Sequence, residues 1–246
     1  GNTIGSQSLA GSLTFSTTTT SATDIYGIHN FTSNAWTSNN NTVGGISVTN
    51  LGASGTVLLI GIRAFTGTTV TWNATGNTVG GSVANSMQLN ATGAASQVLG
   101  MFTSNAPAVL TSNTVRNLTN NIGTGTTTTA SVIGISITSG TPNSTLTQNT
   151  ISNLTNTNAA AAAVVTGIQF NGATANLVAR NQIYGISAAT TSAAAEINGI
   201  RIAGGTTTYR NNMIAIGAGT NNAIGTGSTT GGVNGIFEAG GTNAIV

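Results

Sequence analysis

The sequence predicts an all-β solenoid, in which short strands coil and stack into parallel sheets. Two observations predict it. A repeat of 31 to 39 residues runs through the 246-residue chain, and apolar residues alternate over short spans without a helical period. A unit of this length cannot bury its own apolar face, so neighbouring units must stack on one another.

Two sequence markers define the repeat and keep step along the chain. The first is a glycine followed by an apolar residue, at Gly27, Gly61, Gly100, Gly134, Gly167, Gly199 and Gly235, with spacings of 34, 39, 34, 33, 32 and 36 residues by subtraction. The second is Asn-x-Ile/Val, at Asn2, Asn41, Asn77, Asn113, Asn149, Asn181 and, more loosely, Asn212, with spacings of 39, 36, 36, 36, 32 and 31. Each glycine precedes the next asparagine by 13 to 16 residues, which indicates that both markers belong to one structural unit.

Each unit is expected to hold three short strands, and the clearest copy is the segment Gly134–Leu154. Its first strand follows the glycine, its second precedes Asn149, and its third follows Asn149. A variable segment of about a dozen residues separates the third strand from the next glycine, so we expect ragged loops on one face and two tight corners. The two prolines, Pro107 and Pro142, fall between first and second strands, where a missing N–H does no harm.

This arrangement, Gly-Ile-x-Ile followed by Leu-x-x-Asn-x-Ile-x-x-Leu, resembles the right-handed parallel β-helix repeat family. The resemblance covers the chain from about Asn2 to Ile236. It implies about seven coils in a single segment, 1–246, of a longer repetitive protein. It does not imply one function, because that fold includes polysaccharide lyases and hydrolases, phage tailspikes and adhesins. The composition is most similar to large repetitive surface proteins exported by Bacteroidetes.

Composition excludes several classes of function. Charged residues are 3% of the chain, against about 25% in ordinary proteins, and five scattered arginines cannot neutralise the phosphates of a nucleic acid. Cysteine is absent, so there is no disulfide framework and no thiolate metal site. No apolar run is long enough to span a bilayer, and we expect no membrane insertion. A chain rich in Thr, Asn, Gly and Ser suits an extracellular or cell-surface location.

The asparagines that follow the second strand are expected to stack as a structural ladder, because a side-chain amide has both donors and an acceptor. The expected ladder residues are Asn41, Asn77, Asn113, Asn149, Asn181 and Asn212. We also expect these corners to use the left-handed backbone region, which asparagine tolerates.

The first strand points one residue per coil outward, two positions after its glycine. In the resembling enzymes and tailspikes this strand lines a sugar groove, so these residues form a candidate carbohydrate-contact file. They are His29, Arg63, Phe102, Ser136, Gln169, Arg201 and Phe237. A mixed solvent-facing surface is the plainer interpretation.

Catalytic chemistry has little support in the sequence. Asp24, Glu196 and Glu238 fall in different repeats, so no carboxylate pair for glycoside hydrolysis or Ca²⁺ binding is expected. Glu196 and Arg201 are close enough in sequence to pair locally. We expect no enzyme, no cofactor and no metal.

Outward threonines follow the asparagine in five repeats (Thr3, Thr42, Thr78, Thr114 and Thr150), then give way to Gln182 and Met213. An ice-binding face would need two sustained files of threonines, whereas the sequence has one file and it lapses. Ice binding is therefore only the second alternative. The first alternative is a polysaccharide-binding or polysaccharide-cleaving protein. The preferred hypothesis is a structural or adhesive segment of a large surface protein, with flanking repeats, other subunits of a surface assembly, or glycans as partners.

Overall fold

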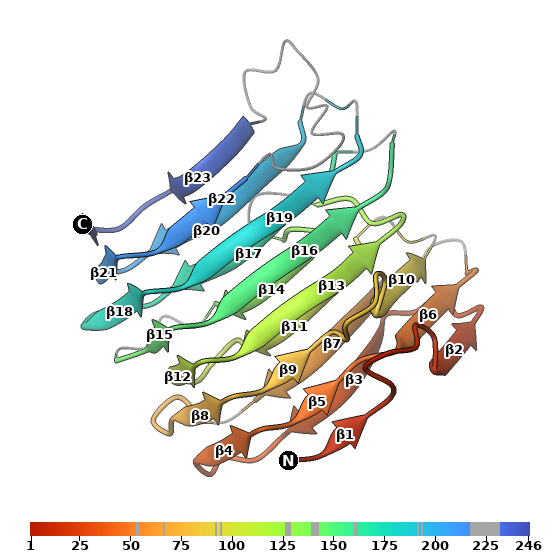
Figure 1. The fold of residues 1–246 in the computed structure, drawn as a ribbon, viewed down its shortest axis with the longest axis horizontal. Coiled ribbons are helices and arrows are strands. Elements are labelled where there is room, and N and C mark those ends of the chain that lie inside the picture. The colour runs from red at the N-terminus through yellow and green to blue at the C-terminus, as the bar shows by residue number, and fades with distance from the viewer. Residues whose placement is uncertain are drawn as a thin grey trace.

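The computed structural model describes residues 1–52, 55–65, 67–91, 93, 95–125, 129–138, 143–159, 162–190, 192, 194–216 and 232–246. The described residues contain no helix, and every strand pairing among them is parallel. Successive coils lie side by side from the red N-terminal end to the blue C-terminal end (Figure 1). The chain is therefore a parallel β-helix, as predicted, with about six turns where about seven coils were expected. The difference is slight, because seven stacked strands are separated by only six turns.

Three parallel sheets enclose the core, one for each expected strand of the repeat. Sheet 1 contains β3 (Thr23–Asn30), β7 (Val57–Ala64), β11 (Gln97–Thr103), β14 (Val132–Ile137), β17 (Val164–Asn171), β20 (Glu196–Gly204) and β23 (Gly232–Glu238). Sheet 2 contains β4 (Trp36–Asn39), β8 (Trp72–Thr75), β12 (Ala108–Thr111), β15 (Thr145–Thr147), β18 (Asn176–Ala179), β21 (Thr207–Arg210) and β24 (Ala244–Ile245).

In each of the first three coils, the strand of sheet 3 is divided into two shorter strands. Its strands are β1 (Thr3–Ile4), β2 (Leu13–Thr17), β5 (Thr42–Val43), β6 (Ile46–Asn50), β9 (Thr78–Val79), β10 (Met87–Ala91), β13 (Thr114–Asn120), β16 (Thr150–Asn156), β19 (Gln182–Ala188) and β22 (Met213–Ala215). In β13, β16 and β19 one residue has a positive φ: Asn117 (55°), Asn153 (53°) and Gly185 (64°). This bend explains why buried residues three apart, such as Val115 and Leu118, both face the core.

The expectation that length varies on one face only is wrong. The connection between sheets 1 and 2 also varies, from two residues before β21 to seven before β8 and β15. Residues 5–12 and 80–86 additionally separate the two halves of sheet 3 in the first and third coils. Only the connection between sheets 2 and 3 is constant, at two residues in each of the six coils that contain it. Pro107 lies buried between β11 and β12, as predicted, and Pro142 lies outside the described residues.

The glycine marker has a packing cause that the sequence does not reveal. A Cβ added to Gly134 would lie 2.5 Å from Ile151 Cγ2 and 2.6 Å from the carbonyl oxygen of Gly167. Equivalent contacts of 2.3–2.6 Å occur at Gly27, Gly61, Gly100, Gly167 and Gly199. None of these glycines has a positive φ. The glycine column therefore lets sheet 3 approach sheet 1 closely, and it is not a turn signal.

The core consists of apolar columns that run along the axis between the three sheets. Representative fully buried members are Ile62, Leu110 and Ile151, one from each sheet. Trp72 is also fully buried, stacks on Trp36 at 5.8 Å between ring centroids, and donates a hydrogen bond from Nε1 to Ser38 Oγ at 3.0 Å. Each coil supplies apolar side chains to the next, so stability depends on stacking and not on any single coil.

Candidate functional site

The ladder asparagines lie in one column at the two-residue corner between sheets 2 and 3. Asn113 shows the pattern. Its backbone N–H and its Nδ2 both donate to Asn149 Oδ1, at 3.0 and 2.9 Å, and Nδ2 also donates to the Ala74 carbonyl at 3.0 Å. The column continues without a break from Asn2 to Asn212, through Asn41, Asn77, Asn113, Asn149 and Asn181. Because the amides bond one another, they are structural and not available to a ligand.

The left-handed residue at this corner is the one before the ladder asparagine. The positive-φ residues are Asn40, Gly76, Ser112, Gln148, Arg180 and Asn211. The corners therefore use the left-handed region as expected, but at the residue before the ladder asparagine and not at the asparagine itself. The amide instead replaces the backbone hydrogen bonds that the sharp corner interrupts.

Two further asparagine contacts were missed by sequence reasoning. Asn153 donates from Nδ2 to Asn117 Oδ1 at 3.0 Å, which joins neighbouring bends of sheet 3. Asn120 and Asn156, both fully buried, accept backbone N–H bonds from the loops that follow them. The signal was present in the repeated Leu-Thr-Asn of residues 118–120 and 154–156.

The outer face of sheet 1 holds the seven residues of the candidate contact file in a single register column. His29 pairs with Arg63, Arg63 with Phe102, and the column continues to Phe237. The seven do not form one exposed surface. His29 is exposed and Arg63 and Phe102 are half-buried, whereas Ser136, Gln169 and Arg201 are buried. The two ends of this face therefore have different chemistry.

At the N-terminal end, Arg63 is the centre of an aromatic cluster. Its guanidinium lies 5.2 Å from the ring centroids of Tyr26 and Phe65 and 5.6 Å from that of Phe102. Arg63 Nη1 donates to the Tyr26 hydroxyl and lies 3.4 Å from Asp24 Oδ2. Tyr26 in turn donates to Asp24 at 2.5 Å. Arg63 therefore has a counter-ion in the preceding coil and aromatic partners in its own coil and in both adjacent coils.

This cluster shifts two pKa values. Burial raises the pKa of Tyr26, and its hydrogen bond to Asp24 adds to the rise. Burial also lowers the pKa of His29, and the positive charge of Arg63 lowers it further. His29 is therefore neutral at pH 7, with its ring 4.2 Å from that of Tyr26.

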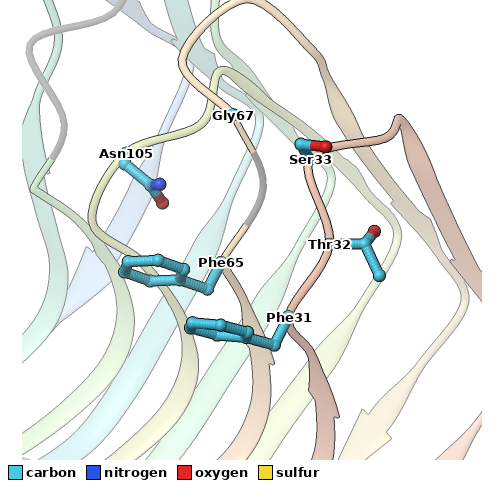
Figure 2. A pocket seen from close by; sticks show the side chains of 6 residues that line it. All are labelled: Phe31, Thr32, Ser33, Phe65, Gly67 and Asn105. Atoms are coloured by element: carbon cyan, nitrogen blue, oxygen red, sulfur yellow. The ribbon is translucent and has the colours of Figure 1, made fainter.

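Beside this cluster lies a hollow of about 210 Å³ lined by Phe31, Thr32, Ser33, Phe65, Gly67 and Asn105. The Phe31 and Phe65 rings stack 4.9 Å apart at 11°. Figure 2 shows the two parallel rings with the Asn105 amide beyond Phe65 and the Thr32 and Ser33 side chains on the adjoining backbone. Phe31 is 69% exposed. This exposed ring stack was not predicted, because Phe31 and Phe65 lie outside the two repeat markers.

The middle of this face carries a second apolar cluster, also missed by sequence reasoning. Ile60, Leu99 and Ile133 are buried on the outer side of sheet 1, with Ala130 and Val164. A hollow of about 130 Å³ extends from Leu99 and Phe102 to Ser136 and Gln169. The outer face of sheet 1 is therefore partly covered, unlike a simple solvent-facing surface.

At the C-terminal end, Arg201 is 3% exposed. The expected local ion pair between Arg201 and Glu196 does not form. Among the described residues, Arg63–Asp24 is the ion pair with its charged atoms within 4.0 Å. Glu196 instead accepts a hydrogen bond from Asn198 Nδ2 at 3.3 Å. Burial lowers the pKa of Arg201, and Glu196 acts in the opposite direction.

The outward threonines also share one column, in which Thr3 pairs with Thr42 and the series ends at Met213. Within the described part of the chain, no group of three or more His, Asp or Glu side chains gathers to hold a metal ion. The same residues include no helix with the length and apolar character that a membrane crossing requires.

No family model matches this chain, and no curated protein or solved structure matches it significantly. Its function must therefore be argued from the geometry above.

Proposed function

We propose that this chain is a structural or adhesive segment of a large extracellular or cell-surface protein of bacterial type, acting as a rigid shaft. The observation that carries the proposal is the asparagine ladder, which joins seven asparagines, six of them at consecutive corners, by hydrogen bonds to their side chains. A shaft needs each unit fixed to the next, and here backbone pairing, apolar columns and the ladder all act along one axis.

The charged residues support a role without catalysis. Asp24 on β3 contacts Tyr26 and Arg63, Glu196 on β20 contacts Asn198, and Glu238 on β23 contacts Asn243, so no described carboxylate faces another. Acid–base hydrolysis of a glycoside needs two carboxyl groups facing one bond. We therefore propose that the coils of residues 1–246 extend or display other parts of the protein.

A deletion of one whole coil tests this proposal. Removing residues 114–149 joins Asn113 to Thr150 and preserves the ladder, because Asn113 and Asn149 are 36 residues apart. In the source cells, we expect the shortened protein to reach the surface and support attachment as before, with a shaft shorter by about 4.8 Å. Removing residues 114–131 is the matched control, because it breaks the register and should prevent folding. Loss of attachment with normal surface labelling would assign a specific site to that coil and contradict a purely structural role.

A second candidate function is weak binding of a glycan at the Phe31–Phe65 ring stack. The specific observation is an exposed aromatic platform beside a hollow that also has hydroxyl and amide side chains, the usual combination in ligand sites. Titration with a panel of neutral oligosaccharides, followed by NMR, tests it. Phe31→Ala should abolish binding, and Phe15→Ala, which removes a 45% exposed phenylalanine from sheet 3, should not. Equal binding by both variants would remove this candidate.

A further inference from the structure

We propose that Arg201 is the anchor of a site for a small oxyanion on the outer face of sheet 1. Arginine is almost never fully buried unless it is paired, yet Arg201 is 3% exposed and its buried Nε and Nη1 have no hydrogen-bond partner. The proposal goes beyond the shaft function and does not depend on it.

The nearest candidate counter-ion is already engaged elsewhere. Glu196 accepts from Asn198 Nδ2, and Asn198 Oδ1 accepts from Asn234 Nδ2 at 2.9 Å. No carboxylate of the described residues lies within 4.0 Å of Arg201. The Phe237 ring, 5.8 Å from the guanidinium, offers a cation–π contact that leaves both N–H donors unused. A buried guanidinium without a partner lowers the stability of the fold, and a bound anion that accepts its hydrogen bonds removes that penalty.

Neighbouring residues extend the polar surface around Arg201. Thr166 lies on the adjacent strand β17, in the column of Ile133 and Asn198, and its buried hydroxyl also has no partner. Gln169 is the register partner of Arg201 and lines the wall of the 130 Å³ hollow described above. That hollow therefore ends one strand away from the guanidinium.

The chemistry selects an anion with two acceptor oxygens. A guanidinium presents paired N–H donors along two of its edges, Nε with Nη2 and Nη1 with Nη2, and either pair matches two oxygens of a carboxylate or sulfate. Arg201 has an unpartnered nitrogen, Nε or Nη1, on each of these edges. Chloride has no such pair of oxygens, and a cation is excluded by charge. A carboxylate or sulfate could be a free ion or a group carried by a polymer, so the experiment must distinguish these sources.

The test is an NMR titration of the arginine Nε–Hε signals of the whole 246-residue chain with sodium acetate, sodium sulfate and sodium hexuronate. Sodium chloride at matched ionic strength is the reference. The chain has five arginines, so the signals are few enough to resolve. Arg201→Met assigns the Arg201 signal by its loss. We expect that signal to shift saturably with acetate and sulfate and not with chloride.

Variants sharpen the result. We expect Arg201→Met to weaken the binding by about tenfold or more, the size expected when a charged hydrogen-bonding partner is removed. Arg210→Met removes an exposed arginine with the same loss of charge and should leave affinity unchanged. Arg201→Lys keeps the charge without the fork and should bind more weakly than the parent chain. Equal affinities in the parent, Arg201→Met and Arg210→Met, or no saturable shift, would overturn the proposal.

The hexuronate arm identifies the source of the anion. Binding of hexuronate together with acetate supports a carboxylate carried on a sugar, and binding of acetate and sulfate alone supports a free small anion. Glu196→Gln provides an internal check, because removal of a nearby negative charge should tighten oxyanion binding. Weaker binding by Glu196→Gln would contradict the site described here.

Discussion

The corner between sheets 2 and 3 and the outer face of sheet 1 differ in how strictly the repeat is kept. The corner has two residues in every coil that contains it, with a ladder asparagine in the second place. The outer column of sheet 1 changes chemical type at almost every coil, from His29 to Phe237. The ladder residue must match both neighbours, since each amide bonds the coil on either side. An outward residue has no such constraint, so any recognition should lie on sheet 1.

The largest effect is expected at the ladder. Asn113→Ala removes a side chain whose Oδ1 accepts two bonds from Asn77 and whose Nδ2 donates to Asn149 and Ala74. Buried partners are left unsatisfied, so the free energy of unfolding should fall by about 3–5 kcal/mol. Urea denaturation measures this change. Asn73→Ala, at an exposed position of β8, is the control and should change stability by less than about 0.5 kcal/mol.

The next effect concerns the glycine column. Gly134→Ala would place Cβ 2.6 Å from a backbone carbonyl oxygen that cannot move easily, so it should cost about 3 kcal/mol of stability. Gly235→Ala is a matched control in the same Gly-Ile motif, because nothing lies within 4 Å of its added Cβ. Similar melting temperatures for the two variants would refute the close packing around the glycine column, in which the neighbouring strand of sheet 1 and a side chain of sheet 3 both contact Gly134.

A smaller effect compares the two arginines of the outer column. Arg63→Met removes the ion pair with Asp24 and the aromatic contacts of the guanidinium. The Arg63 side chain is 17% exposed and the Asp24 side chain 39% exposed. Because solvent screens such a pair, stability should fall by only about 1 kcal/mol. The buried Nε and Nη1 of Arg201 have no hydrogen-bond partner, so in chloride buffer Arg201→Met should leave the free energy of unfolding unchanged or raise it. Denaturation of both variants at low salt checks this ordering, and a larger loss for Arg201→Met would reverse it.

The smallest effect is the titration of His29. Its pKa lies below 6.5 in the folded chain, first because of burial and second because of Arg63. The unfolded chain therefore binds a proton more readily as pH falls, and the stability contributed by neutral His29 is lost below about pH 6.5. In Arg63→Met the pKa should rise, since a positive neighbour is removed and Asp24 remains. NMR titration of the imidazole measures both values, and an unchanged or lower pKa in the variant would contradict the arrangement.

Sequence periodicity predicted the strands and their register because equivalent residues of successive coils contact one another. Gly134, Leu146, Asn149 and Ile151 recur at nearly fixed spacing, so a one-dimensional pattern contains the three sheets and the ladder. It could not predict that Ser112 or Gln148 takes the left-handed position, because those residues differ from coil to coil. Nor could it explain the glycines, whose close contacts come from sheet 3 and from the neighbouring strand of sheet 1.

The sequence by itself determined the β-helix, because each coil can bury its apolar residues only against a neighbour of the same pattern. Tertiary structure alone decided the chemistry of the outer face. It brought Phe31 onto Phe65 and gave Arg63 a counter-ion two residues from Tyr26, while it left Arg201 buried without one. These outcomes depend on side-chain conformations and on loops between coils. No repeat constrains either, so only the folded chain fixes them.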